Sequence, residues 1–249
     1  MSGHSKWSSI KRQKGINDVK RGASFTKVAR EIGMAARAGG GDPDGNFRLR
    51  LAIEKARGVN MPADNIKRAI ERATGAGESE QFEEIVYEGY GPGGVAILVE
   101  AATDNRNRTA AEVRSRFAKS GGSLAASGAV AWQFEARGVI TVQRAGVDPD
   151  DVALAAIDAG ADDVDAEADP IEIFTAPAEL EHVRRRLQEA GVPVDEAESA
   201  MIAKQTVELD SGRARQALRL VEELEELDDV QRVTANFDIP EEVFAEVAG

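Results

Sequence analysis

The chain has 249 residues, of which 42% are hydrophobic and 30% are charged, and its formal net charge at pH 7 is −13. This length suffices for two or three domains with cores of their own, and the lack of cysteine excludes disulfides, thiolate nucleophiles and cysteine-based metal sites. Two histidines disfavour a histidine triad, and without a long apolar run or a signal-peptide core we expect a cytoplasmic protein with no membrane partner.

The opening stretch MSGHSKWSSIKRQKG collects four cations around Trp7 and contains no acid; the cations are Lys6, Lys11, Arg12 and Lys14. Residues 1–75 hold 16 Lys/Arg and 7 Asp/Glu, a net charge of +9, whereas the remaining residues hold 15 and 37, a net charge of −22. A basic segment attracts polyanions, while an acidic body keeps a protein soluble and repels nucleic acid elsewhere. The asymmetry therefore favours a polyanion-binding N-terminal domain over a merely charged surface.

The basic segment shows three runs with apolar residues at helical spacing. The first ends at Gly39, the second runs from about Asn46 to Gly58, and the third follows Pro62 and closes at Gly75. Three short amphipathic helices predict a small bundle. At about 100° per residue, four cations of the first helix share one arc opposite its apolar side: Lys20, Lys27, Arg30 and Arg37.

The rest of the chain alternates strand-like and helical patterns. Residues 84–99 read as two strands joined by GYGPGG, residues 107–120 as a helix and residues 129–134 as a strand. Residues 139–199 then give a complete βαββαβ order, and strand, helix and strand follow at 204–209, 213–227 and 231–238. The middle unit is complete whereas its flanks are not, so we expect it to be inserted in the flanking domain.

The predicted fold class is therefore α+β, an N-terminal helical bundle followed by two α/β domains, of which the middle one is ferredoxin-like. The predicted domains are 1–77, a discontinuous domain of 78–137 and 203–249, and an inserted domain of 138–202.

Two patterns that could suggest a cofactor or metal are weak. Gly89, Gly91 and Gly94 fit G-x-G-x-x-G, but a strand follows them where a dinucleotide site requires a helix. The acids between Asp148 and Asp169 do not have EF-hand spacing and are expected to form a solvated face. We therefore expect no cofactor, no metal and no identifiable catalytic residue.

The stretch TDNRNRT at 103–109 lies between a strand and a helix. Its Asn and Asp residues are suited to capping that helix, so the stretch can be understood as a capped turn. Arg106 and Arg108 exceed what capping requires, and two guanidinium groups in an acidic domain are suited to phosphate contacts. Both interpretations stay open.

Three stretches carry a family resemblance: GHSKW at 3–7, AARAGGGDPDGNFRLRLAIEKARGVNMPADNIKRAI at 35–70, and YEGYGPGGVAILVEAATDNRNRTAAEVR at 87–114. With them, the chain resembles the YebC/PmpR family over essentially its whole length; this family includes the mitochondrial translational activator of cytochrome c oxidase. The resemblance implies a three-domain protein without known enzymatic activity. Family members are described as DNA-binding transcriptional regulators, or as ribosome-associated factors that help translation, including through proline-rich stretches.

Three function classes follow: a nucleic-acid-binding regulator, an adaptor whose acidic domains recruit a basic partner, and an enzyme using carboxylates alone. The first is favoured by the basic N-terminal segment, by Trp7 as a stacking platform and by the resemblance. Ribosomal RNA or tRNA on the ribosome is slightly preferred to double-stranded DNA, because no helix-turn-helix signature or zipper is present. We expect a monomer whose nucleic-acid-binding residues are Lys6, Trp7, Lys11, Arg12, Lys14, Lys20, Arg21, Lys27, Arg30, Arg37, Arg106 and Arg108.

Overall fold

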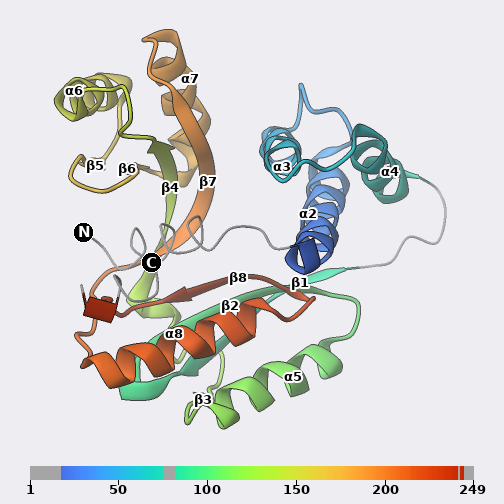
Figure 1. Ribbon diagram of the computed structural model, residues 1–249. Helices are drawn as coiled ribbons and strands as arrows, with labels where there is room; N and C mark the ends of the chain where they lie inside the picture. Colours follow the sequence, from blue (N-terminus) through green and yellow to red (C-terminus); the bar gives the residue numbers. More distant parts are fainter. Residues whose placement is uncertain (1–17, 76–81, 241, 244–249) are drawn as a thin grey trace. The chain divides into compact units, whose positions relative to one another are not determined.

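A computed structural model describes residues 18–75, 82–240 and 242–243 of the chain, with side chains described from Phe25 onward (Figure 1). The described residues fall into two compact units. The first contains the residues up to Val130 together with Gln216–Val233, and the second contains Ala131–Arg215 together with the described residues from Thr234 onward. Within the described residues, no helix combines the length and the apolar character needed to cross a bilayer.

The first unit begins with three helices, α2 (Asp18–Gly39), α3 (Phe47–Gly58) and α4 (Ala63–Thr74). Helix α2 packs against both of the others. The helices bury one apolar cluster, as the sequence periodicity predicts, and we call these three helices the helical module. The cluster consists of Val28, Ile32, Ala35, Ala36, Leu49, Ala52, Ile53, Ala56, Met61 and Ile66.

Asn46 fixes the connection between the first two of these helices. Its side-chain oxygen caps α3 by accepting a hydrogen bond from the Leu49 N–H at 3.1 Å. Its side-chain amide donates to the carbonyl oxygens of Ala35 and Gly40, each at 2.8 Å. One buried side chain thus satisfies a donor at the start of α3 and carbonyls at the end of α2.

The helical module is followed by a sheet with strand order β3-β1-β2-β8, in which β1 pairs antiparallel with both β2 and β3. Helices α5 and α8 cover one face of it (Figure 1). The bounds are β1 Glu83–Tyr90, β2 Ala96–Thr103, β3 Ser123–Leu124, β8 Val230–Ala235, α5 Arg106–Lys119 and α8 Ser211–Glu225.

The glycines between β1 and β2 serve packing and turn geometry. A Cβ atom on Gly89 would lie 2.6 Å from the Phe117 ring of α5, so only glycine lets the strand and helix approach this closely. Gly94 has a φ of +79°, in the region that glycine tolerates. A short turn, η1 (Pro92–Gly94), leads directly into β2, and the strand that follows agrees with the expectation that this is no dinucleotide fingerprint.

The second unit is ferredoxin-like. Its elements follow the order β4, α6, β5, β6, α7, β7, and the antiparallel sheet has the strand order β5-β6-β4-β7. This confirms the predicted fold class. The bounds are β4 Phe134–Val142, α6 Pro149–Ala159, β5 Asp163–Asp165, β6 Ile171–Thr175, α7 Leu180–Glu189 and β7 Val194–Ala203.

Two predicted strands are wrong. The stretch at 129–134 leads through a short turn, η2 (Ala131–Gln133), into the longer strand β4. The stretch at 204–209 makes one isolated bridge, between Val207 and Phe237, and the strand before it continues to Ala203.

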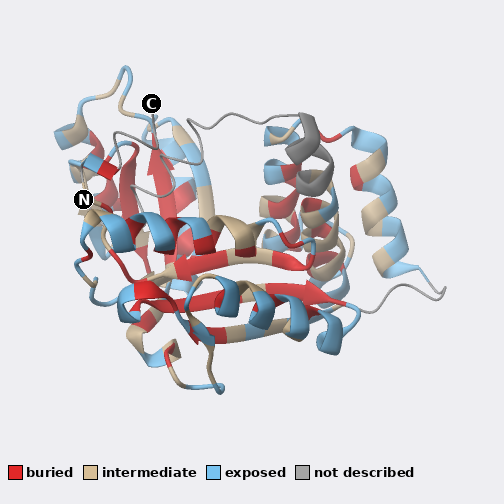
Figure 2. Cartoon of the chain, turned by 60° about the horizontal axis from the view of Figure 1, so that its bottom comes forward, coloured by how far each residue is buried: buried red, intermediate tan, exposed pale blue. Residues whose placement is uncertain are grey.

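Figure 2 shows buried residues along the strands and on the inward sides of the helices. The domain boundaries proposed from the sequence remain a prediction.

Candidate nucleic-acid interface

The structure describes the side chains of five residues predicted to bind nucleic acid: Lys27, Arg30, Arg37, Arg106 and Arg108. Two more, Lys20 and Arg21, lie on the backbone of α2, but their side chains fall outside the described part of the chain. The remaining residues lie outside the described residues altogether: Lys6, Trp7, Lys11, Arg12 and Lys14.

Lys27 and Arg30, on α2, contact the turn between α8 and β8. The ammonium group of Lys27 donates to the backbone carbonyl of Glu225. The guanidinium group of Arg30 donates to the Asp229 carboxylate at 2.9 Å and lies over the Phe82 ring, 4.9 Å from its centre. Both side chains are half-buried, whereas Arg37, in the last turn of the helix, is exposed.

Asp229 is the centre of this contact and is only 2% exposed. One carboxylate oxygen accepts from Arg30, and the other accepts from Arg108 and Thr109, each at 2.6 Å, and from Thr103 at 3.2 Å. We call Asp229 and these four donors the Asp229 cluster. A buried carboxylate with this many donors is fully satisfied, so the cluster ties α2, the β2–α5 turn and the start of β8 to one another.

The charges of the cluster reinforce one another. Burial raises the pKa of Asp229, but the hydrogen bonds from Thr109 and Arg108, with the charges of Arg30 and Arg108, outweigh it and hold the pKa below its ordinary value. The hydrogen bonds to Asp229 and then to Asp104 raise the pKa of Arg108. Asp229 is therefore an anion and Arg108 a cation throughout the neutral range.

The TDNRNRT stretch caps the helix that follows it, as one of the two interpretations predicts, whereas a phosphate-contacting role of its two arginines stays a prediction. Asn105 caps α5 through its side-chain oxygen, which accepts from the Arg108 N–H at 3.1 Å. Arg108 is engaged by Asp229 and by Asp104, the latter at 2.7 Å. Arg106 is 67% exposed and 3.8 Å from a Glu83 carboxylate oxygen, so of the two arginines it is the one that extends into solvent.

The backbone carbonyl of Arg106 is held by Tyr87, whose hydroxyl donates to it at 3.2 Å. Burial raises the pKa of Tyr87, Arg106 opposes this rise, and the charge of Asp229 adds to it. The Tyr87 hydroxyl therefore stays protonated at neutral pH and keeps its role as a donor.

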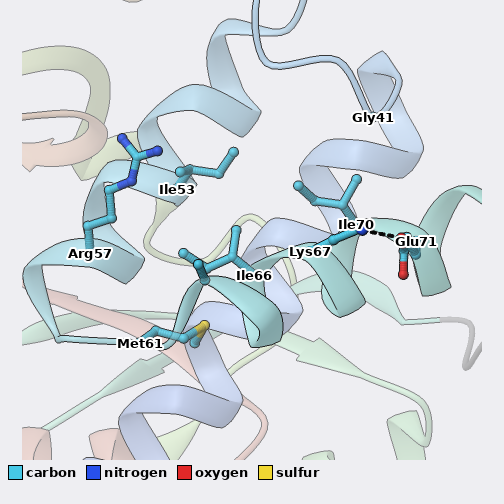
Figure 3. Close-up of a pocket in the computed structure, with 9 residues that line it drawn as sticks. Gly41, Ile53, Arg57, Met61, Ile66, Lys67, Ile70 and Glu71 are labelled. Carbon is cyan, nitrogen blue, oxygen red and sulfur yellow. Dashed lines mark ion pairs between the residues drawn. The ribbon is translucent and has the colours of Figure 1, made fainter.

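An open groove of about 400 Å³ lies between α3 and α4 (Figure 3). Ile53, Ile66 and Ile70 converge on it, and Met61 lies below them. Its edges carry Arg57 from α3 and, from α4, Lys67 paired with Glu71 at 3.7 Å. An apolar floor with a cationic edge can accept the flat face of a base while the edge contacts a phosphate.

Arg57, Arg68 and Arg72 form no ion pair with any described residue. Among the residues that the structure describes, Arg68 is held only by a hydrogen bond from its Nε to the backbone carbonyl of Asp64, at 3.2 Å. By contrast, Arg48 is paired with Glu84, and Lys55 with Glu31 at 2.8 Å. The three arginines were not among the binding residues predicted from the sequence, although Arg68 and Arg72 stand four residues apart on one side of an amphipathic helix.

Comparison with known proteins decides the family. Residues 5–76 match a family model described as the TACO1/YebC protein N-terminal domain, and residues 82–237 match one described as the TACO1/YebC second and third domain. The chain belongs to the TACO1/YebC family. This confirms the resemblance read from its sequence.

Several members of the TACO1/YebC family match the chain over nearly its whole length. A probable transcriptional regulatory protein of Roseiflexus castenholzii is 56% identical over 98% of this chain and 97% of its own. A protein of the same name from Rubrobacter xylanophilus is 55% identical over the full length of both chains. The crystal structure of a conserved hypothetical protein from Aquifex aeolicus has a TM-score of 0.84 and 48% identity, covering 90% of this chain and 92% of its own.

Proposed function

We propose that the chain is a non-enzymatic, nucleic-acid-binding regulator of gene expression that contacts its target through the helical module. The observation that carries the proposal is the groove between α3 and α4, in which an apolar floor meets Arg57, a cation that no described acid neutralises. Arg57 stands at the groove, and Arg68 and Arg72 extend the cationic surface along α4. The predicted cations Lys6, Lys11, Arg12 and Lys14 add to the same polyanion-binding function.

Within this function we favour RNA on the ribosome, and hence a role in translation. A compact basic module without a dimerisation element suits the shape and phosphate pattern of folded RNA, and an open groove suits an unpaired base. The alternative is a DNA-binding transcriptional regulator, which the names of the Roseiflexus and Rubrobacter relatives favour. Both put the protein in the cytoplasm and require neither cofactor nor catalytic residue.

The test is an equilibrium binding titration of the full chain with a structured RNA and with duplex DNA of equal length, at several salt concentrations. Each phosphate contact contributes a log–log salt slope of roughly −0.7 to −0.9. Replacing Arg57, Arg68 and Arg72 together by Gln should weaken binding by about ten- to a hundredfold. It should also reduce the magnitude of the log–log salt slope by the amount that up to about three phosphate contacts contribute.

A matched control removes the same number of positive charges from the second unit, through Arg185→Gln, Arg186→Gln and Arg213→Gln, all at exposed positions. This variant should bind like the parent. Equal affinity of parent, test variant and control would contradict the role of the groove, and the absence of any nucleic-acid binding would favour the adaptor hypothesis. Tighter binding to RNA than to DNA, with RNase-sensitive co-sedimentation with ribosomes, would decide for translation.

A further inference from the structure

Helix α5 concentrates positive charge within the acidic part of the chain. Its 14 residues hold five cations and one acid, whereas the rest of the chain after residue 75 holds 10 cations and 36 acids. The helix thus has a net charge of +4, against −26 for those other residues. This contrast favours a polyanion as the ligand of α5. The five cations are Arg106, Arg108, Arg114, Arg116 and Lys119.

The last three of these cations are not neutralised within the described part of the chain. The side chains of Arg114, Arg116 and Lys119 form no ion pair and no hydrogen bond with any described residue. Other cations of the acidic part are held by carboxylates, as in the pairs Arg137–Glu135, Arg184–Glu181 and Arg213–Asp210. The charge of α5 is therefore available to a ligand.

The exposed side of α5 has two cationic edges. The inner side of the helix packs on β1 and β3 and buries Thr109, Val113 and Phe117. At about 100° per residue, Arg114 lies on one edge of the outer side, and Arg116 and Lys119 lie on the other. Between the edges the side chains are short and exposed; they belong to Ala111, Ser115 and Ala118. We call the three cations and these three residues the α5 surface.

Stabilisation of the helix accounts for only part of this charge. Arg116 and Lys119 stand in the last turn of α5, where cations interact favourably with the helix dipole. Arg114 stands before that turn, and no residue three or four positions away from it is acidic. An anion from outside the chain is the partner that the exposed guanidinium group of Arg114 can meet.

The width of a helix decides which nucleic-acid groove the α5 surface fits. A helix with its side chains is about 10–12 Å across, whereas the minor groove of B-DNA is only about 6 Å wide. The major groove of B-DNA admits a helix, but it is read by side chains that hydrogen-bond to base edges. Between the edges of the α5 surface, only Ser115 carries a hydrogen-bonding side chain.

The minor groove of A-form RNA is wide and shallow, and it displays 2′-hydroxyl groups between two phosphate strands. Two cationic edges match two phosphate strands, and the short side chains between them allow the helix to approach the groove closely. Recognition of this kind depends on the shape of the double helix and needs few contacts to bases.

We propose that the α5 surface docks in the minor groove of a double-stranded RNA segment, with Arg114 on one phosphate strand and Arg116 and Lys119 on the other. The inference rests on the proposed function and deepens it, because the groove between α3 and α4 then takes an unpaired base of the same RNA. The Asp229 cluster joins the first turn of α5 to α2, through Arg108 and Arg30. The ligand class is an RNA stem with unpaired nucleotides beside it.

The test measures equilibrium binding of the full chain to four fluorescein-labelled probes of matched sequence. They are an RNA duplex with a single-stranded overhang, the same duplex with blunt ends, the single RNA strand, and the blunt duplex as DNA. The variant Arg114→Gln, Arg116→Gln, Lys119→Gln should bind both RNA duplexes at least about tenfold more weakly, with a smaller log–log salt slope. It should bind the single strand as the parent does. The control with Arg185, Arg186 and Arg213 changed to Gln should match the parent on every probe.

A second variant tests the fit of the helix without changing its charge. Ala111→Leu with Ala118→Leu keeps all cations in place, and leucine is a good helix former at these exposed positions. The added bulk between the edges should hold α5 away from the groove and weaken binding of the blunt RNA duplex at least about threefold. The urea midpoint of each variant shows that it is folded.

Parent-like binding of the blunt RNA duplex by either α5 variant would overturn the proposal, as would equal affinity of the parent for the RNA and DNA duplexes. The variant with Arg57, Arg68 and Arg72 changed to Gln tests the proposed function separately. If it alone lost affinity, only the role of the α5 surface would fall. If the α5 variants alone lost affinity, the role of the α3–α4 groove would fall and the α5 surface would stand.

Discussion

The cations of the helical module fall into two groups that differ in what surrounds them. Arg30 is half-buried against the carboxylate of Asp229, whereas Arg57, Arg68 and Arg72 are exposed and form no ion pair with the described residues. Arg30 and Arg72 belong to similar amphipathic helices, yet one stabilises the fold and the other is free to meet a ligand. Charge alone does not identify a binding residue; the partner that a folded chain supplies decides its role.

The largest effect is expected from removing Asp229, the buried partner of Arg30. Asp229→Ala leaves Arg30, Arg108 and two threonine hydroxyls around an empty position, and breaking a buried ion pair in this way costs about 3–5 kcal/mol. Urea unfolding should show a loss of this size. Asp104→Ala, which removes the exposed acid next to Arg108, should cost only a small fraction of that. Equal losses would mean that Asp229 contributes no more than a surface acid.

A matched pair of arginine substitutions sharpens the comparison. Arg30→Ala deletes a charged hydrogen bond to the Asp229 carboxylate and another to the Asp228 carbonyl, and should lower the free energy of unfolding by about 1.5–3 kcal/mol. Arg72→Ala should change it by less than about 0.5 kcal/mol, because its side chain is exposed. Nucleic-acid affinity should respond in the opposite order, with Arg72→Ala weakening binding more. If fully folded Arg30→Ala protein lost more nucleic-acid affinity than Arg72→Ala, Arg30 would belong to the nucleic-acid interface.

Acid should weaken the cluster with a definite sign. The pKa of Asp229 lies below its ordinary value in the folded chain, so the unfolded chain takes up the proton at a higher pH. The stability from this group is complete above the unfolded value of about 3.9 and is lost as the pH falls through the folded pKa. The urea concentration at the unfolding midpoint should fall more steeply for the parent than for Asp229→Asn as the pH is lowered from 7 to 3. Parallel curves of midpoint against pH would contradict this.

The smallest effect is expected at the edge of the groove. Lys67 and Glu71 lie 3.7 Å apart, four residues apart on α4, and are 75% and 60% exposed. A double-mutant cycle with alanine at both positions should give a coupling of about 0.5 kcal/mol or less. A coupling several times larger would mean that this exposed pair stabilises the fold as strongly as the buried Asp229 cluster does.

Local patterns predicted most of the fold. The strand at 171–175 has the expected bounds, and the three helices of the module end at or within one residue of Gly39, Gly58 and Gly75. The sequence pattern predicted one strand ending at 134 and another beginning at 139, whereas β4 runs from Phe134 to Val142 through Gly138. The lack of a side chain at Gly138 makes room for Thr175 and Leu180, a contact that no local pattern contains.

The candidate site was predictable only in outline. The charge asymmetry indicates the helical module, but nothing near Arg30 in the sequence points to Asp229, which stands 199 residues later in an acidic stretch that looks solvated. The groove likewise depends on how α3 and α4 pack, and helical periodicity defines only which side of each helix is apolar. Long-range pairing separates the structural cations from those available to a ligand.

The separation between Arg30 and Asp229 also has a consequence for synthesis. Ribosomes add about 5–20 residues per second, so Asp229 is added roughly ten to thirty seconds after Gly75 completes the helical module. The apolar cluster of the three helices lies entirely before that point and does not depend on later residues. A nascent chain thus carries a helical module whose Lys27 and Arg30 have not yet met the α8–β8 turn, and this module is more cationic at its surface than the finished protein.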